Sequence, residues 1–148
     1  MSNVWNVFDS VVARFGNRTA VEIQRRDGLD RFTYGELRQM ARERALWLQA
    51  NGIGTGDRCA ILAHNDADWC AAYLGILRLG AIAVPLDTNY SAQQVATIVN
   101  DSGARILLAN DRLTPVAKEA LTSSSCQLAP LAPLAPLAPL APLAPLAP

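Results

Sequence analysis

The N-terminal part of the chain contains two patterns of apolar positions, one helical and one extended. Apolar side chains recur at helical spacing across residues 4–15, which predicts an amphipathic helix. Two stretches rich in β-branched and aromatic residues, 19–24 and 31–34, then flank an Asp27-Gly28 pair. Because Asp-Gly is a favoured tight-turn sequence, these two stretches are expected to pair as a β-hairpin.

The strongest helical signal in the chain begins at Thr33. Thr33 and Glu36 have the spacing of a capping box, in which each side chain satisfies a free backbone N–H at the start of a helix. Gly52 is the residue type that most readily takes the left-handed conformation at a helix end. We therefore predict a helix that starts after Thr33 and stops before Gly52. Its buried face is an apolar stripe made of Leu37, Met40, Ala41, Ala45 and Leu48.

From residue 58 onward, short apolar segments alternate with helical patterns. The apolar segments are residues 58–62, 81–84 and 105–109, and helical periodicity occupies residues 66–80 and 91–103. Strands that are apolar on both faces and alternate with helices are typical of a parallel sheet covered on both sides. The body of the chain is therefore predicted to have an α/β fold.

This pattern ends at residue 122. A Thr-Ser-Ser-Ser segment leads into seven uninterrupted copies of Leu-Ala-Pro, residues 128–148, which hold seven of the nine prolines and no charged residue. Proline cannot continue a helix, and it biases the preceding alanine toward extended geometry. We expect a polyproline-II-like or disordered tail with leucines along one edge. The predicted division is a folded part, residues 1–121, followed by a linker and low-complexity tail, residues 122–148.

The distribution of charge and hydropathy is typical of a soluble protein. The chain has 13 basic and 13 acidic residues, and the two signs are interspersed, which argues against a nucleic-acid partner or an anionic membrane surface. Its first ten residues lack the basic start and apolar stretch of a signal peptide. The most apolar segment, residues 70–86, is interrupted by Arg78 and Pro85, so it is expected in a protein core and not in a bilayer. We expect a cytoplasmic protein without a transmembrane segment.

The cysteine and histidine content argues against a metal site. The three cysteines, Cys59, Cys70 and Cys126, show no C-x-x-C spacing, and His64 is the single histidine. Cys59 and Cys70 lie in apolar runs and are interpreted as small core residues. Free thiols of this kind suit a reducing cytosol.

The segment Gly-Ile-Gly-Thr-Gly-Asp, residues 52–57, invites comparison with a phosphate-binding glycine loop. A dinucleotide-binding loop follows a strand and opens a helix, so that the helix N-terminus faces the phosphate. Here the order is reversed, because a predicted helix ends at Gly52 and a predicted strand begins near Arg58. The segment is therefore interpreted as a helix-to-strand connection.

The other polar candidates also have simpler structural interpretations. The hydroxyl groups of residues 122–125 lack the neighbouring glycine and lysine of a phosphate loop and favour a solvated linker. Asp66 and Asp68 lie at a predicted helix start, where carboxylates cap free N–H groups. His64 is interpreted as a polar strand-end residue, since no nucleophile is recognisable beside it. No catalytic, cofactor-binding or metal-binding residue is assigned. The aromatic and aliphatic residues Trp69, Tyr73, Ile76 and Leu77 recur at helical spacing and are predicted to belong to the core.

Four stretches, taken in order, resemble a known family. They are FTYGEL (32–37), GIGTGDRCAILAHNDADW (52–69), AAYLGILRLGAIAVPLDTNYS (71–91) and DSGARILLAND (101–111). Their order is similar to that in adenylate-forming enzymes, which include AMP-forming acyl-CoA synthetases, luciferases and peptide-synthetase adenylation domains. FTYGEL resembles the first core motif of the family, and LRLGAIAVPLD resembles the second. The sequences of these stretches are most similar to those of the long-chain fatty-acid–CoA ligase branch.

The resemblance implies a fold and a reaction class. It implies the N-terminal subdomain of the adenylate-forming fold, in incomplete form. In the complete family enzyme, ATP and Mg²⁺ activate a carboxylate as an acyl-adenylate, and coenzyme A then displaces AMP. That chemistry requires a Ser/Thr/Gly-rich loop with lysine, acidic residues and a late lysine. The matched region, residues 4–111, precedes all of these motifs, so the resemblance assigns none of them to a residue of this chain.

Two functional hypotheses therefore remain open. In the first, the chain is a truncated N-terminal part of a fatty-acid–CoA ligase and is inactive alone, with a tail that arises from a repetitive gene segment or frameshift. In the second, it is a non-catalytic interaction protein that reuses the subdomain and displays the proline-rich tail. An incomplete sheet would also leave an uncovered edge and apolar helix faces, which predicts self-association.

Overall fold

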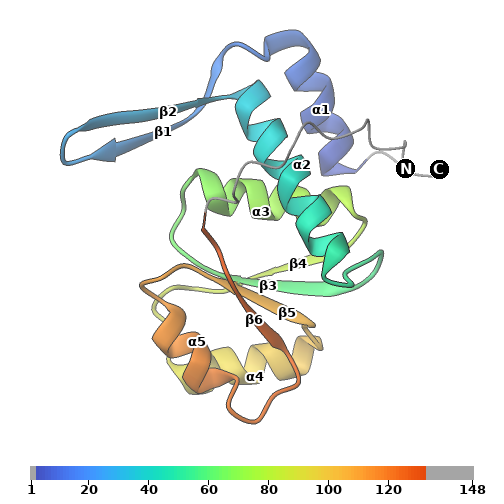
Figure 1. The fold of residues 1–148 in the computed structure, drawn as a ribbon, viewed down its shortest axis with the longest axis vertical. Helices are drawn as coiled ribbons and strands as arrows, with labels where there is room; N and C mark the ends of the chain where they lie inside the picture. Colours follow the sequence, from blue (N-terminus) through green and yellow to red (C-terminus); the bar gives the residue numbers. More distant parts are fainter. Residues whose placement is uncertain (1–2, 133–148) are drawn as a thin grey trace.

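The structure is a computed structural model that describes residues 3–132 (Figure 1). Two layers of helices enclose a parallel sheet, and a helix and a hairpin extend beyond one of these layers. In chain order the elements are α1 (Val4–Phe15), β1 (Thr19–Arg25), β2 (Gly28–Thr33), α2 (Tyr34–Ala50), β3 (Arg58–Leu62), α3 (Ala67–Arg78), β4 (Ile82–Pro85), α4 (Ala92–Ser102), β5 (Ile106–Ala109), α5 (Thr114–Ala120) and β6 (Gln127–Pro130).

The main sheet has the strand order β4-β3-β5-β6, and each neighbouring pair is parallel. Helices α2 and α3 cover one face, and α4 and α5 cover the other (Figure 1). The structure confirms the predicted α/β fold with flanking helices. Each strand of this sheet is joined to the next strand in the chain by a helix, as parallel strands require.

The core lies on both faces of the central strands. Along β3, Cys59 and Ile61 join the apolar cluster beneath α2 and α3, whereas Ala60 and Leu62 join the cluster beneath α4 and α5. Strand β5 alternates in the same way, and all four of its residues are buried. This two-sided burial explains why the sequence of these strands is uniformly apolar.

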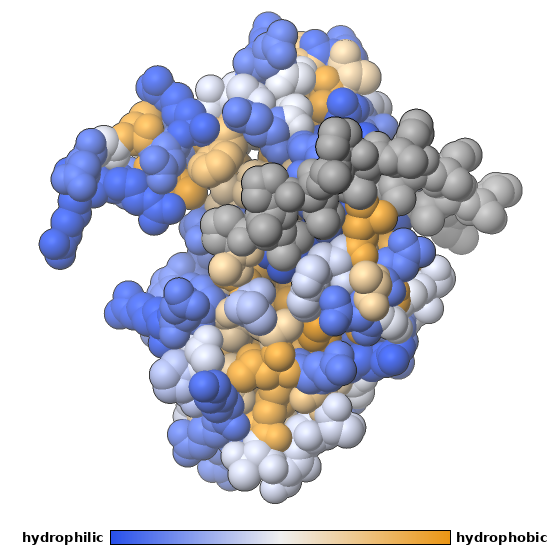
Figure 2. Space-filling model, viewed as in Figure 1, coloured by the Kyte–Doolittle hydropathy of each residue, from blue (hydrophilic) through white to orange (hydrophobic). Residues whose placement is uncertain are grey.

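The N-terminal elements pack on the outer side of α2 and α3. Trp5 of α1 is buried in a third cluster with Leu37 and Ala41 of α2, and the Arg78 guanidinium carbon lies 4.8 Å from the centre of its ring system. The β1–β2 hairpin projects away from the body (Figure 1) and is mostly hydrophilic on the face shown in Figure 2. Two exposed ion pairs join its strands, Arg25 with Asp30 and Arg31 with Glu22.

Local capping signals correspond closely to the observed helix ends. The Thr33–Glu36 capping box is present, and a second one joins Ser91 and Gln94 at the start of α4. Helix α2 ends at Ala50, and Gly52 takes the left-handed conformation with φ of 82°. The predicted hairpin also forms, although β2 begins at Gly28 instead of residue 31 because the turn contains only two residues.

Each outer strand of the sheet ends in a proline. Pro85 of β4 pairs with Ile61, and Pro130 of β6 pairs with Ala109. On β4 the N–H groups of Ile82 and Leu86 donate to β3, so the position of Pro85 faces the open edge. A proline there sacrifices no hydrogen bond of the sheet and cannot donate one to a further strand.

The start of the Leu-Ala-Pro repeat differs from its prediction. Residues 122–148 were expected to form a linker and a disordered or polyproline-II-like tail, but Gln127–Pro130 form β6 and pair in parallel with β5. The expectation is wrong for this first copy, because its available backbone N–H groups can join the sheet and its apolar side chains can be buried. Residues 133–148, on which most of the tail prediction falls, lie outside the described residues. The domain boundary at residues 121 and 122 stays a prediction.

Candidate functional site

The topology of the sheet singles out the carboxyl ends of β3 and β5. From β3 the chain crosses to β4 on one side, whereas from β5 it crosses to β6 on the other side. In open α/β sheets, ligands bind outside the carboxyl ends of the strands where the direction of winding changes in this way. The loops after Leu62 and Ala109 therefore form the first place to search for a site.

His64 and Asn110 meet at this switch point. Asn110 Nδ2 lies 3.1 Å from His64 Nδ1; His64 is exposed and Asn110 is half-buried. The amide oxygen of Asn110 accepts the backbone N–H of Leu113 at 3.1 Å, which orients its NH₂ group toward the ring. His64 Nδ1 is then the acceptor of this hydrogen bond. A neutral ring therefore carries its proton on Nε2, and this N–H is available to donate to another group. The pair joins the two loops and leaves the Nε2–H of His64 as a donor at the carboxyl edge.

A hollow of about 430 Å³ adjoins His64. Its aromatic wall is Trp69, which stacks on Tyr73 with ring centroids 5.4 Å apart. The carboxylate of Asp87 is already engaged, because its Oδ1 accepts the N–H of Asn89 at 2.8 Å. The lining contains no lysine or arginine; it consists of Ala63, His64, Asn65, Trp69, Pro85, Leu86, Asp87 and Thr88. These residues can accept an uncharged or weakly polar group, but they supply no cation for a phosphate.

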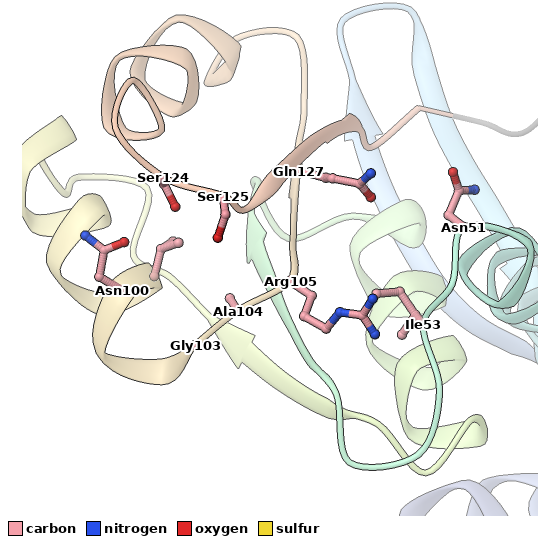
Figure 3. Close-up of a pocket in the computed structure, with 10 residues that line it drawn as sticks. Asn51, Ile53, Asn100, Gly103, Ala104, Arg105, Ser124, Ser125 and Gln127 are labelled. Atoms are coloured by element: carbon pink, nitrogen blue, oxygen red, sulfur yellow. The ribbon is translucent and has the colours of Figure 1, made fainter.

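A second hollow, of about 380 Å³, lies at the opposite, amino edge of the sheet (Figure 3). Its lining is mostly polar, and Arg105 is its one charged side chain. Arg105 Nη1 donates to the carbonyl oxygen of Gly52 at 3.0 Å and to Asp57 Oδ2 at 2.7 Å. The guanidinium therefore serves the fold by fastening the segment 52–57 to the start of β5.

Asp57 completes this connection. Its Oδ2 also accepts the N–H of Gly54 at 2.8 Å. That hydrogen bond, together with the Arg105 guanidinium, holds the pKa of the Asp57 carboxyl below its ordinary value. The glycine-rich segment is thus a helix-to-strand connection between α2 and β3, as predicted.

The two aspartates at the start of α3, both predicted to cap the helix, have different roles in the structure. Asp66 is the N-cap residue, and its Oδ1 accepts the N–H of Trp69 at 2.8 Å, which confirms the capping prediction. Asp68 lies in the first turn, where burial and then the neighbouring Asp66 charge raise the pKa of its carboxyl. The two carboxylates act separately, one as a cap and one as a half-buried charge.

The cysteines have the environments of structural residues. Cys59 and Cys126 are buried, and Cys70 is half-buried. Burial raises the pKa of the Cys59 thiol to about 12 and that of Cys126 to about 11, so both stay protonated near neutral pH. Within residues 3–132, no three His, Cys, Asp or Glu side chains gather as a metal-binding group would require.

The remaining candidates are found in the core or in a turn. Ile76 is buried, Trp69 and Tyr73 pack against the same cluster, and Leu77 is only half-buried. Residues 122–125 form the turn between α5 and β6, where the hydroxyl of Ser124 accepts the N–H of Cys126 at 3.2 Å. Among residues 3–132, no helix combines the length and the apolar character needed to cross a bilayer.

Sequence reasoning missed Asn110, Arg105 and Arg44. Asn110 directly follows a predicted strand, and that position could have indicated the carboxyl edge of a parallel sheet. Arg105 offered no such signal, because its partners are 48 and 53 residues away in the chain. Arg44 is 2 % exposed although it belongs to a helix with many charged residues. Only the packing of distant segments identifies these last two.

Comparison with known proteins identifies the family. The family model described as AMP-binding enzyme matches residues 8–139. The chain belongs to the AMP-binding enzyme family. Its α/β architecture is that of the N-terminal part of adenylate-forming acyl- and aryl-CoA ligases.

Individual relatives of this AMP-binding protein span several acid classes. It is 37 % identical over 86 residues to the long-chain-fatty-acid–CoA ligase FadD13 of Mycobacterium tuberculosis, covering 58 % of this chain and 17 % of that protein. It is 35 % identical over 111 residues to surfactin synthase subunit 2 of Bacillus subtilis, covering 75 % of this chain and 3 % of that protein. The crystal structure of a benzoate CoA ligase from Burkholderia xenovorans superposes on this chain with a TM-score of 0.80 at 28 % sequence identity. The superposition covers 93 % of this chain and 27 % of the ligase chain. The chain thus spans about a quarter or less of the length of these proteins.

Proposed function

We propose that the chain supplies the N-terminal sheet of a cytoplasmic, AMP-forming fatty-acid–CoA ligase and does not activate a carboxylate by itself. The complete reaction would join a carboxylate oxygen to the α-phosphorus of ATP and release pyrophosphate. The thiol of coenzyme A would then attack the acyl carbon and release AMP. The family match and the parallel sheet support this assignment of the reaction class.

The observation that carries the second half of the proposal is the electrostatic character of the carboxyl edge. Binding the triphosphate of ATP requires cationic groups or backbone N–H groups directed at the phosphates. The hollow beside His64 has no lysine or arginine in its lining. The single lysine of the sequence, Lys118, is exposed on α5 and does not line that hollow. The residues that line this hollow do not fit the triphosphate of ATP, so no catalytic step is assigned to them.

The choice of a fatty acid is the finer part of the proposal. It is supported by the similarity to the long-chain-fatty-acid–CoA ligase FadD13, whereas the benzoate CoA ligase and surfactin synthase relatives bear names of other classes. The acid is best tested in a chimaera in which residues 3–132 replace the matching part of FadD13. Retained turnover of long-chain acids supports the proposal, and a chimaera that folds but turns over only benzoate contradicts it.

The inactivity of the chain is tested by ATP–pyrophosphate exchange. The purified chain is incubated with ATP, Mg²⁺, labelled pyrophosphate and fatty acids of several lengths. Exchange is expected to equal that of a sample without protein, while complete FadD13 serves as the positive control. Exchange above the blank that persists after repeated purification, and that scales with the amount of this chain, would refute the proposed inactivity.

Two further properties accompany the proposal. Three free cysteines support a reducing, cytoplasmic location. Exposed Val4 and Val7 on α1 and exposed Ile82 on β4 support self-association through apolar surface. Sedimentation at micromolar concentration is expected to show oligomers, and a sharp monomer boundary would contradict this expectation.

A further inference from the structure

The hydrogen-bonding direction of β6 shows why a proline-containing strand fits at this edge. The N–H of Gln127 donates to the Arg105 carbonyl at 2.9 Å, and the N–H of Leu131 donates to the Ala109 carbonyl at 2.8 Å. Successive N–H groups of a strand point in opposite directions, so residues 127, 129 and 131 face β5. Pro130 occupies a position that faces the open edge, where a missing N–H costs no hydrogen bond.

The repeat has a period of three residues, whereas a strand has a period of two. Successive prolines of an extended Leu-Ala-Pro repeat therefore alternate between the open edge and the β5 side. Pro130 falls on the open side, and the next proline, Pro133, would fall on the β5 side, where the ladder needs an N–H. The repeat preceding Leu128 would also place a proline at residue 127, but the sequence has Gln127 there. The segment 127–132 thus has no proline at any of its three positions that face β5, namely Gln127, Ala129 and Leu131.

Side chains of this segment occupy defined positions. Ala129 and Leu131 are buried in the cluster beneath α2 and α3, and Leu128 packs against the opposite cluster beneath α4 and α5. Cys126, just before the strand, is also buried. The segment is therefore held by apolar contacts on both faces of the sheet as well as by its backbone.

Arg44 holds the end of the segment. Its Nη2 donates to the Ala132 carbonyl oxygen at 2.7 Å, and its guanidinium carbon lies 5.6 Å from the centre of the Trp47 ring system. Its Nη1 is buried without a hydrogen-bond partner among the described residues. A guanidinium this far removed from water is costly unless it is paired. The contact with Ala132 is therefore worth more than a hydrogen bond at the surface.

We propose that the edge of β5 and the Arg44 side chain form a strand-binding site for an extended Gln-Leu-Ala-Pro-Leu-Ala segment. Residues 127–132 occupy this site within one chain, and a separate peptide of the same sequence can replace them. Addition of a strand to a sheet edge is an established mode of peptide recognition, in which the backbone provides affinity and the alternating side chains provide specificity. This inference is independent of the proposed ligase function.

The proposal predicts that the segment behaves as a separable ligand. A protease site is inserted into the full chain between Ser123 and Ser124, and the folded protein is cut there. The cut protein is then heated through its transition and cooled with an excess of a fluorescent peptide that carries residues 124–132. Incorporation of the peptide is measured by fluorescence anisotropy after gel filtration.

A matched peptide with Gln127→Pro tests the register. It keeps every apolar side chain but lacks the N–H that bonds to Arg105, so its incorporation is expected to be roughly fivefold weaker. A Leu131→Asp peptide should not be incorporated at all. Failure of the natural peptide to be incorporated, with the cut protein either folded or unrecovered, would overturn the proposal. Equal incorporation of the natural and Gln127→Pro peptides would overturn it as well.

Discussion

Gly75 of α3 lies directly against the backbone of Ala41 of α2. A methyl group built on Gly75 would stand 2.8 Å from the Ala41 carbonyl oxygen and 3.1 Å from the backbone nitrogen of Ala45. The contact allows α3 to approach α2 closely and brings both helices onto the same face of the sheet (Figure 1). Glycine in a helix interior is otherwise unfavourable, so its presence here reflects packing.

Gly75→Ala is expected to destabilise the protein by about 1–2 kcal/mol. The gain in helix propensity, about 1 kcal/mol, is outweighed because a clash with backbone atoms cannot be relieved by changing a rotamer. Chemical denaturation provides the measurement. Gly54→Ala is the matched control, since a methyl there would meet only Asp57 Oδ2 at 4.0 Å. A Gly75→Ala protein as stable as the Gly54→Ala protein would show that the helices can separate freely.

Asp57→Asn is expected to lower the thermal stability near neutral pH, and this loss of stability should be smaller at acidic pH. The folded state lowers the pKa of Asp57, first through the Gly54 N–H and then through Arg105, so the ionised form is favoured by folding. This contribution is present above the unfolded pKa of about 3.9 and is lost as the pH falls through the folded value. Thermal transitions recorded from neutral to acidic pH should therefore converge for the natural and variant proteins.

The control for this substitution is Asp27→Asn in the hairpin turn. Asp27 is exposed, and Asn-Gly forms the same kind of turn as Asp-Gly. The thermal midpoint of this control at neutral pH should therefore equal that of the natural protein. If the difference between the Asp57→Asn and natural midpoints did not shrink in acid, the Asp57 ion pair would have no role in stability.

Asp68→Asn is expected to raise the thermal midpoint at neutral pH. Burial, followed by the Asp66 charge, raises the pKa of Asp68 in the folded state, so folding disfavours the ionised form. This penalty grows as the pH rises from the unfolded pKa to the folded pKa and is absent in stronger acid. The stabilisation by asparagine should therefore disappear below about pH 3.9.

Asp66→Ala provides a contrast within the same helix turn. Asp66 caps the N-terminus of α3 through the Trp69 N–H, and loss of such a cap costs about 0.5–2 kcal/mol. The two neighbouring substitutions should thus shift the midpoint in opposite directions. A lower midpoint for both would mean that Asp68 also stabilises the helix start.

Shortening the chain at two points is expected to have different effects. A chain that ends at Cys126 loses β6, Leu131 and the partner of Arg44, so its thermal transition should fall or vanish. A chain that ends at Ala132 keeps all three and should melt as the full chain does, since Pro133 cannot donate an N–H toward β5. Differential scanning calorimetry distinguishes the two. Equal thermal midpoints for the two shortened chains would show that β6 is a passive tail that does not stabilise the fold.

Local signals were sufficient to predict most individual elements of this protein. The Thr33–Glu36 box, the Asp27-Gly28 turn and the apolar runs around Cys59 and Ile106 act through residues adjacent in the chain. The order of elements around Gly52 likewise distinguished a connection from a phosphate loop. Such signals depend on backbone propensity and hydrophobic period, which are properties of short segments.

Tertiary structure alone decided the roles of β6, of Arg44 and of the His64–Asn110 pair. Leu-Ala-Pro has no intrinsic preference for a strand, and Gln127–Pro130 become one because β5 offers carbonyl groups and the two apolar layers take Leu128 and Leu131. His64 and Asn110 lie 46 residues apart in the chain and meet only because β3 and β5 are parallel neighbours. Strand pairing is a contact between distant segments, so its register cannot be derived from the residues of either segment alone.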